Sequence, residues 1–224
     1  MPSSAAELIY NDDHVELYYG DCLEFRLDKS IGCIITHPPY IPNRDNEVAL
    51  LNKIIPKLTN YLCDGGILCT VNTDLRKNSQ IRLRHLDIIE TCLKSNLKLY
   101  DYRIWDKGFG HNLYRIAFSH ILAFYKGNRP RIKRPNAIDD ILHGKAKFFG
   151  KFRDALAGIV TATLINAYSL PGDHIYDPFA GTGTTLLQAR NLGRNSTGIE
   201  IELEIARIAK RRLTFENEQT SLFG

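Results

Sequence analysis

Two short segments contain the residue types best suited to chemistry. The first is "HPPY", residues 37–40, which ends the buried apolar run 31–36. Its two prolines fix the backbone where the strand ends and aim a carbonyl outward. Turn chemistry accounts for the two prolines but does not require the histidine before them or the tyrosine after them. The second segment is "DPFAGTGTT", residues 177–185, far along the chain.

The second segment follows a short strand and opens a helix. Gly181 and Gly183 permit positive φ and close approach to a ligand, and the helix N-terminus presents unpaired N–H groups to it. Glu200 ends the next strand, where it is placed to accept hydrogen bonds from ribose hydroxyls. Leu186 replaces the third glycine of a dinucleotide fingerprint, and the lysine of a P-loop is missing. Because Asp177 would repel a phosphate, the pattern favours a nucleoside cofactor with a cationic group.

Alternating strands and helices must position these two segments. The predicted strands cover 14–19, 31–36, 67–71, 99–105, 116–125, 175–176 and 196–202, and the predicted helices cover 47–62, 81–93, 155–168, 184–193 and 205–213. Such alternation predicts an α/β fold with a doubly wound, mostly parallel sheet. A hairpin over 99–125 adds an antiparallel strand. We expect Pro56 to kink or split its helix and the tail after Thr214 to be frayed.

Composition indicates one domain, residues 1–224, with a basic loop region over 126–153. The chain has 224 residues, 44% hydrophobic content and a net charge of +4, which permits a polyanionic partner without requiring one. Five cysteines without a CxxC pair predict reduced core thiols and no zinc cluster. With no apolar run long enough for a bilayer and no signal peptide, the sequence predicts a soluble, intracellular protein.

Together the two segments resemble the amino-directed DNA methyltransferases of the circularly permuted beta class. That family carries a Pro-Pro-Tyr motif first and a DPF-x-G-x-GTT loop near the C-terminus, and this chain has both in that order. "YYGDCLE" and "GRNSTGIEIE" extend the resemblance over Val15–Leu213. The resemblance implies a Rossmann-like seven-stranded methyltransferase sheet with one antiparallel strand. It also implies S-adenosylmethionine as cofactor, DNA methylation on a base flipped from the helix, and a restriction–modification setting in the bacterial or archaeal cytoplasm or nucleoid.

The resemblance also implies roles for individual residues. The catalytic motif would comprise His37, Pro38, Pro39 and Tyr40. Asp21 would accept a hydrogen bond from the cofactor's adenine, Cys22 would lie beside that ring, and Glu200 would hold the ribose. The full set of cofactor-binding residues would be Asp21, Cys22, Lys151, Phe152, Asp177, Pro178, Phe179, Ala180, Gly181, Gly183, Thr184, Thr185, Glu200 and Ile201.

His37 departs from the family pattern, which usually has Asp for adenine-N6 and often Ser for cytosine-N4 enzymes. Neutral imidazole can accept one hydrogen bond but brings no negative charge. The residue type, together with Lys151-Phe152 in the later "GKFRDAL" segment, favours cytosine-N4 over adenine-N6. The alternatives are an RNA or protein-amide methyltransferase, and an impaired cofactor-binding or DNA-binding subunit.

DNA contacts must come from short loops, because little of the chain is left for a target-recognition region. The candidate residues are Arg129, Arg131, Lys133, Arg134 and His111. The basic residues are equally compatible with a solvated surface loop. A second subunit of a homodimer could supply further contacts, and we expect no membrane partner. His85 and His120 are interpreted as structural, since no second metal-binding residue type lies at a matching spacing.

Overall fold

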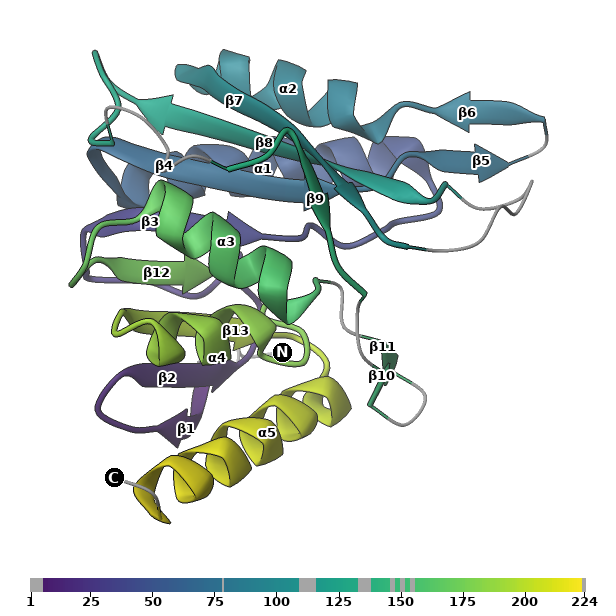
Figure 1. Ribbon diagram of the computed structural model, residues 1–224. Helices are drawn as coiled ribbons and strands as arrows, with labels where there is room; N and C mark the ends of the chain where they lie inside the picture. Colours follow the sequence, from purple (N-terminus) through teal and green to yellow (C-terminus); the bar gives the residue numbers. More distant parts are fainter. Residues whose placement is uncertain are drawn as a thin grey trace.

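The computed structural model arranges nine strands in one sheet with the order β1-β2-β13-β12-β3-β4-β8-β7-β9 (Figure 1). The structure describes residues 6–77, 79–108, 116–132, 138–145, 148–149, 152–153 and 156–222. Within this sheet β8 is antiparallel to β4 and β7, and β1 is antiparallel to β2. The other neighbouring pairs are parallel.

The strands of this sheet are β1 (Glu7–Asn11), β2 (Val15–Tyr19), β3 (Ile31–Thr36), β4 (Leu62–Asn72), β7 (Leu97–Asp106), β8 (Phe118–Lys126), β9 (Ile141–His143), β12 (His174–Asp177) and β13 (Asn195–Glu200). Two small hairpins pair β5 (Leu75–Lys77) with β6 (Gln80–Arg82), and β10 (Phe148–Phe149) with β11 (Phe152–Arg153). The helices are α1 (Arg44–Tyr61), α2 (Arg84–Lys94), α3 (Gly158–Tyr168), α4 (Thr184–Asn191) and α5 (Leu203–Leu222).

The predicted doubly wound sheet is confirmed. Strands β2, β13, β12, β3, β4, β8 and β7 form the expected seven, with β8 as the antiparallel member. All six residues of β3 are buried, as its continuous apolar run predicts. Two edge strands, β1 and β9, extend this core beyond the prediction.

Several local predictions were wrong. The last helix does not end near Leu213 but continues to Leu222. The basic segment was expected to be irregular, yet it contains β9, which pairs with β7. The hairpin β5–β6 precedes α2, so that helix begins at Arg84. Pro56 lies inside α1 without splitting it.

Helices cover both faces of the sheet (Figure 1). Helices α1 and α2 pack on one face, where apolar side chains of β3, β4 and β8 meet them. On the other face, α3 packs over the middle of the sheet, and α4 and α5 pack near β2. Reactive loops can therefore emerge only where the strands end.

All five cysteines are free thiols; Cys22, Cys33, Cys69 and Cys92 are buried, while Cys63 is partly exposed. None of the helices among the described residues has both the length and the apolar composition needed to span a membrane.

Candidate active site

The two chemically distinctive segments meet at the carboxyl-terminal edge of the parallel strands. β3 ends at Thr36, β12 ends at Asp177, and the two strands are hydrogen-bonded neighbours. The Thr36 hydroxyl donates a 2.7 Å hydrogen bond to Oδ1 of Asp177, joining positions 141 residues apart in the sequence. Ligand crevices in open α/β sheets form at this edge.

The glycine-rich loop between β12 and α4 has the left-handed backbone that its glycines permit. Gly181 has φ of 55°, and Gly183, at the N-cap of α4, has φ of 82°. A Cβ added at Gly181 would meet its nearest non-neighbouring atom, a carbonyl oxygen, only at 3.8 Å. Arg212 of α5 fixes the loop by donating to the Thr182 carbonyl at 2.6 Å. The loop therefore leaves room for a ligand beside Gly181.

Asp177 is a buried carboxylate held by neutral donors. The Thr36 hydroxyl and the Phe179 amide donate to its Oδ1, and the Thr185 hydroxyl also stabilises the charged form. Burial nevertheless raises the pKa of Asp177 to about 6, and the charge of Glu200 adds to this effect. A buried carboxylate satisfied in this way is well suited to a cationic ligand group.

Glu200 and Asp21 continue the same edge on the next two strands. Glu200 ends β13 and is buried; its two carboxylate oxygens accept from the Gly181 and Glu202 amides at 2.9 and 2.8 Å. β2 ends beside it, because Tyr19 pairs with Glu200. Asp21 follows, with its Oδ1 accepting from the Leu23 amide at 2.8 Å.

Other predicted cofactor residues lie in or beside these loops. Cys22 is buried, and desolvation raises the pKa of its thiol to about 12, so it acts as an apolar surface. Ile201 is 58% exposed at the end of β13. Within the glycine-rich loop Pro178, Ala180, Thr182, Gly183, Thr184 and Thr185 are buried, and Phe179 is partly buried.

The segment His37–Tyr40, called the HPPY loop here, follows β3 directly. Pro38 is buried, whereas Tyr40 is 46% exposed, with the Arg84 guanidinium carbon 5.8 Å from its ring centroid. Burial, with the positive charges of Arg84 and Lys107 nearby, lowers the pKa of His37 to about 4. His37 is therefore neutral near pH 7.

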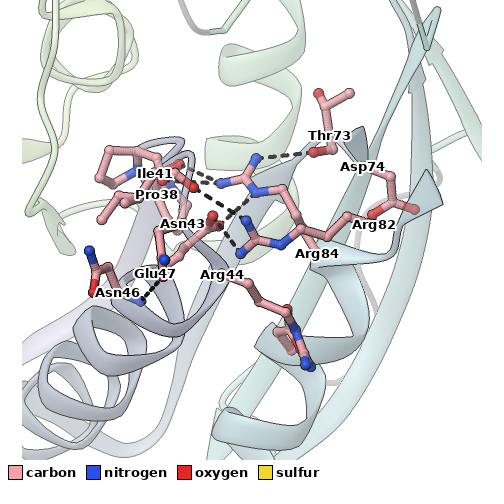
Figure 2. A network of polar contacts seen from close by, with 12 residues as sticks. Pro38, Ile41, Asn43, Arg44, Asn46, Glu47, Thr73, Asp74, Arg82 and Arg84 are labelled. Atoms are coloured by element: carbon pink, nitrogen blue, oxygen red, sulfur yellow. Dashed lines mark hydrogen bonds and ion pairs between the residues drawn. The ribbon is translucent and has the colours of Figure 1, made fainter. Parts of the chain in front are cut away.

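A buried ion-pair network contacts the backbone of the HPPY loop (Figure 2). Arg84, in the first turn of α2, is 2% exposed and donates from Nε to Glu47 Oε1 at 2.6 Å. Its two terminal nitrogens donate to the carbonyls of Thr73 and Pro39 at 3.0 and 3.1 Å. Arg82 donates to the other oxygen of Glu47 at 2.8 Å.

Sequence reasoning missed this network. Glu47 and Arg84 lie on helices predicted as amphipathic, where charged residues ordinarily face water. Their positions in the sequence could have indicated the pair, because Glu47 and Arg84 each lie in the first turn of a helix. Those turns lie at the same edge of the sheet as the HPPY loop.

Parts of this chain are similar in sequence to known DNA methyltransferases. Residues 160–211 match the N6/N4 DNA methylase family model, described as "DNA methylase". The Type II methyltransferase M.MjaI of Methanocaldococcus jannaschii is 28% identical over 212 residues, covering 77% of this chain and 69% of that enzyme. The family-model match and this relative together support an amino-methyltransferase of the N4/N6 class.

Two further likenesses differ in extent. M2.DpnII, a Type II methyltransferase of Streptococcus pneumoniae, is 42% identical over 72 residues. That match spans 32% of this chain but only 27% of the relative's length. TTHA0409 from Thermus thermophilus, solved in complex with S-adenosyl-L-methionine, superposes with a TM-score of 0.74 at 24% identity. The superposition covers 89% of this chain and 93% of the TTHA0409 chain, which establishes a shared fold.

The candidate DNA-contact residues that the structure describes lie apart from the HPPY loop. Arg131 is at the amino-terminal edge of the sheet, where it pairs with Asp173 at 2.9 Å and its amide donates to the Gly65 carbonyl. The Arg129 carbonyl lies beside Gly65 as well. The side chains of His111, Lys133, Arg134, Lys151 and Phe152 lie outside what the structure describes.

The fold also brings Asp74, His85 and His120 together, next to the Arg84 network that contacts the HPPY loop. His85 and His120 were interpreted as structural, because no second metal-binding residue type lies at a matching spacing in the sequence. The fold supplies the third residue and the proximity that linear spacing did not reveal.

Proposed function

We propose that this N6/N4 methylase transfers a methyl group from S-adenosylmethionine to the exocyclic amine of a flipped base in DNA. Cytosine-N4 is the proposed target in preference to adenine-N6. The observation that carries the proposal is the 2.7 Å hydrogen bond from Thr36 to Asp177. This bond joins the strand ends from which the HPPY loop and the glycine-rich loop emerge. An amine bound at the first loop could therefore meet a methyl donor bound at the second.

The residues of the glycine-rich loop fit this cofactor. S-adenosylmethionine, when bound, supplies an electrophilic methyl group on a sulfonium, together with an amino group, a ribose and an adenine. Asp177, buried among neutral donors, would hold the amino group. Glu200 would accept from the ribose hydroxyls, and Asp21, following the neighbouring strand, would accept from the adenine amine. The open space at Gly181 would admit the ligand close to the backbone.

The HPPY loop would bind the base and prepare its amine. The lone pair of an exocyclic amine is delocalised into the ring, which makes it a poor nucleophile. Two acceptors, the neutral His37 ring and the Pro38 carbonyl, would draw on the amine hydrogens and localise that pair. Tyr40, whose ring is half-exposed, would stack on the flipped base. No covalent link to the protein is required.

Positioning would supply much of the rate enhancement, and Arg84 is the residue placed to provide it. It contacts the Pro39 carbonyl at 3.1 Å, whereas its distance to the Pro38 carbonyl is 3.5 Å, at the limit of a hydrogen bond. This leaves the Pro38 oxygen available to the amine. Arg84 is thus a positioning residue, acting through the loop.

The target preference rests on His37 and on Lys151-Phe152. A neutral imidazole lacks the negative charge that the Asp of adenine-N6 enzymes provides. Phosphate contacts from Lys133, Arg134 and His111 remain part of the proposal, and contacts from Arg129 and Arg131 would require DNA to reach the amino-terminal edge of the sheet.

The test is methyl transfer by the purified chain, with isotopically labelled cofactor, to DNA from a methylation-free host. Digestion and mass spectrometry would quantify N4-methylcytosine and N6-methyladenine separately, with RNA and protein as parallel substrates. Tyr40→Ala should lose about 1–3 kcal/mol of base stacking, roughly a five- to hundredfold fall in kcat/KM, with cofactor affinity unchanged. His14→Ala, at an exposed site on β2's amino-terminal side, serves as the control.

Label in RNA or protein rather than in DNA would overturn the choice of substrate. Tight cofactor binding without transfer to any substrate would instead identify a cofactor-binding subunit. His37→Ser and His37→Asp would then show whether the histidine is the cause.

A further inference from the structure

Asp74, His85 and His120 converge from three elements at the carboxyl-terminal edge of the sheet. Asp74 follows β4, His85 lies in the first turn of α2, and His120 belongs to β8. His85 Nδ1 is 2.8 Å from Asp74 Oδ2, and His120 Nε2 is 3.1 Å from the same oxygen. One potential ligand atom from each residue lies within 4.8 Å of the others.

The cluster is sheltered and its rings are oriented. Asp74 and His120 are each 5% exposed, and the two imidazoles stack with centroids 4.0 Å apart. The remaining nitrogen of His120, Nδ1, is 2.8 Å from the Tyr102 hydroxyl. Metal-binding histidines typically engage their second nitrogen in this way, which fixes the ring. Asp74 also accepts from the His85 amide at 3.2 Å.

The cluster can bind an ion without releasing a proton, because a change of tautomer frees one nitrogen of each imidazole. With both rings neutral and their N–H groups facing the Asp74 carboxylate, each imidazole donates to Asp74, and Nδ1 of His120 then accepts from the Tyr102 hydroxyl. If each imidazole changes tautomer, both inward nitrogens become ligands, and His120 Nδ1–H donates to the Tyr102 oxygen instead. The carboxylate supplies the negative charge.

We propose that Asp74, His85 and His120 form a binding site for a divalent transition-metal ion, with zinc as the first candidate and a fourth position open to water. Two imidazoles and one carboxylate are a ligand set that zinc accepts, at about 2.0–2.2 Å each. Tetrahedral ligands at that range are separated by about 3.3 Å. The two nitrogen–oxygen distances, 2.8 and 3.1 Å, already lie near this spacing, and a shift of the two imidazoles would complete the site.

The location gives the ion a structural consequence. It would tie α2 to β8 and to the chain just after β4. The adjacent Thr73 carbonyl accepts from Arg84, which also holds the HPPY loop, and Figure 2 places Asp74 beside this network. The charge of Lys107, whose Nζ donates to the Thr73 hydroxyl, opposes the ion. We therefore expect affinity below that of a site without such a neighbour.

The test uses untagged full-length protein, stripped with a chelator and titrated with Zn²⁺ or Co²⁺. We expect one ion per chain by calorimetry and visible Co²⁺ absorption bands typical of a four- or five-coordinate site. At a hundredfold excess of free Zn²⁺ over its Kd, the unfolding midpoint should rise by roughly 5–10 °C. Methyl transfer is not needed for any of these readouts, so failure of the proposed function leaves them intact.

His85→Gln should abolish the Co²⁺ spectrum and the thermal shift while leaving the circular dichroism of the free protein unchanged. Asp74→Asn tests the carboxylate in the same assays. His14→Gln is the matched control, because His14 is exposed and precedes β2 at the opposite, amino-terminal edge of the sheet. This variant should keep full metal binding. Absence of stoichiometric binding, or binding that survives His85→Gln, would overturn the proposal and identify the cluster as a metal-free hydrogen-bond network.

Discussion

Replacing Asp177 with asparagine should make the folded protein more stable at neutral pH and less able to bind its cofactor. The side chain is buried, and its pKa rises from 3.8 to about 6 on folding. Asparagine preserves the shape and can still accept from the Thr36 hydroxyl. The carboxylate is thus retained at a cost to stability, as expected for a residue whose partner is a ligand.

The magnitude follows from the pKa. One pKa unit corresponds to 1.36 kcal/mol, so ionising Asp177 in the folded state costs on the order of 3 kcal/mol relative to the unfolded chain. Because the folded pKa is raised, the folded state holds its proton longer. The stabilising effect of the protonated form is present below about pH 4 and is lost as pH rises to about 6. We expect Asp177→Asn to raise the free energy of unfolding by about 1–3 kcal/mol at neutral pH.

Urea unfolding of both proteins at several pH values measures this, and calorimetry measures S-adenosylmethionine binding. Cofactor affinity should fall at least about tenfold, since a hydrogen bond to a charged group contributes about 1.5–3 kcal/mol. Asp173→Asn is the matched control: it breaks the ion pair with Arg131 at the opposite edge and should lower stability. A variant at position 177 less stable than the wild type at neutral pH would refute the reasoning.

Three further outcomes are expected. Arg84→Met breaks the buried pair with Glu47, so urea unfolding should show a loss of about 3–5 kcal/mol in the free energy of unfolding. Methyl transfer should slow about a hundredfold with unchanged cofactor affinity. Lys94→Ala, which breaks an exposed pair, should cost only about 0.3–0.5 kcal/mol of stability. His37 has a lowered pKa, so its contribution to stability, complete above about pH 6.5, should disappear as pH falls toward about 4; urea unfolding of His37→Gln should show no such loss. Gly183→Ala should cost more than Gly193→Ala in thermal unfolding. Both have positive φ, worth about 1–2 kcal/mol, but only the first would press its Cβ against α5, at 3.1 Å.

The sequence identified the sheet and its reactive edge because both depend on local pattern. The apolar run of β3 and the strand–glycine–helix succession around Gly181 are readable from neighbouring residues alone. The family resemblance then led us to expect the two segments side by side, and the Thr36–Asp177 hydrogen bond joins them.

The features that were missed depend on contacts between distant residues. Arg84 is an ordinary helix residue by local pattern, and only the approach of α1 to α2 buries it against Glu47. The cluster of Asp74, His85 and His120 is likewise assembled by three separate elements. Edge strand β9 was missed because three residues within a basic segment carry little periodicity.

The distribution of thiols offers a practical handle on this molecule. Four of its cysteines are buried, and desolvation raises the pKa of the Cys22, Cys33, Cys69 and Cys92 thiols. Cys63 alone is partly exposed, and it lies beside Arg131 at the end of the sheet opposite the HPPY loop. A maleimide dye should therefore modify a single position of the native protein and leave the reactive loops at the opposite edge unobstructed.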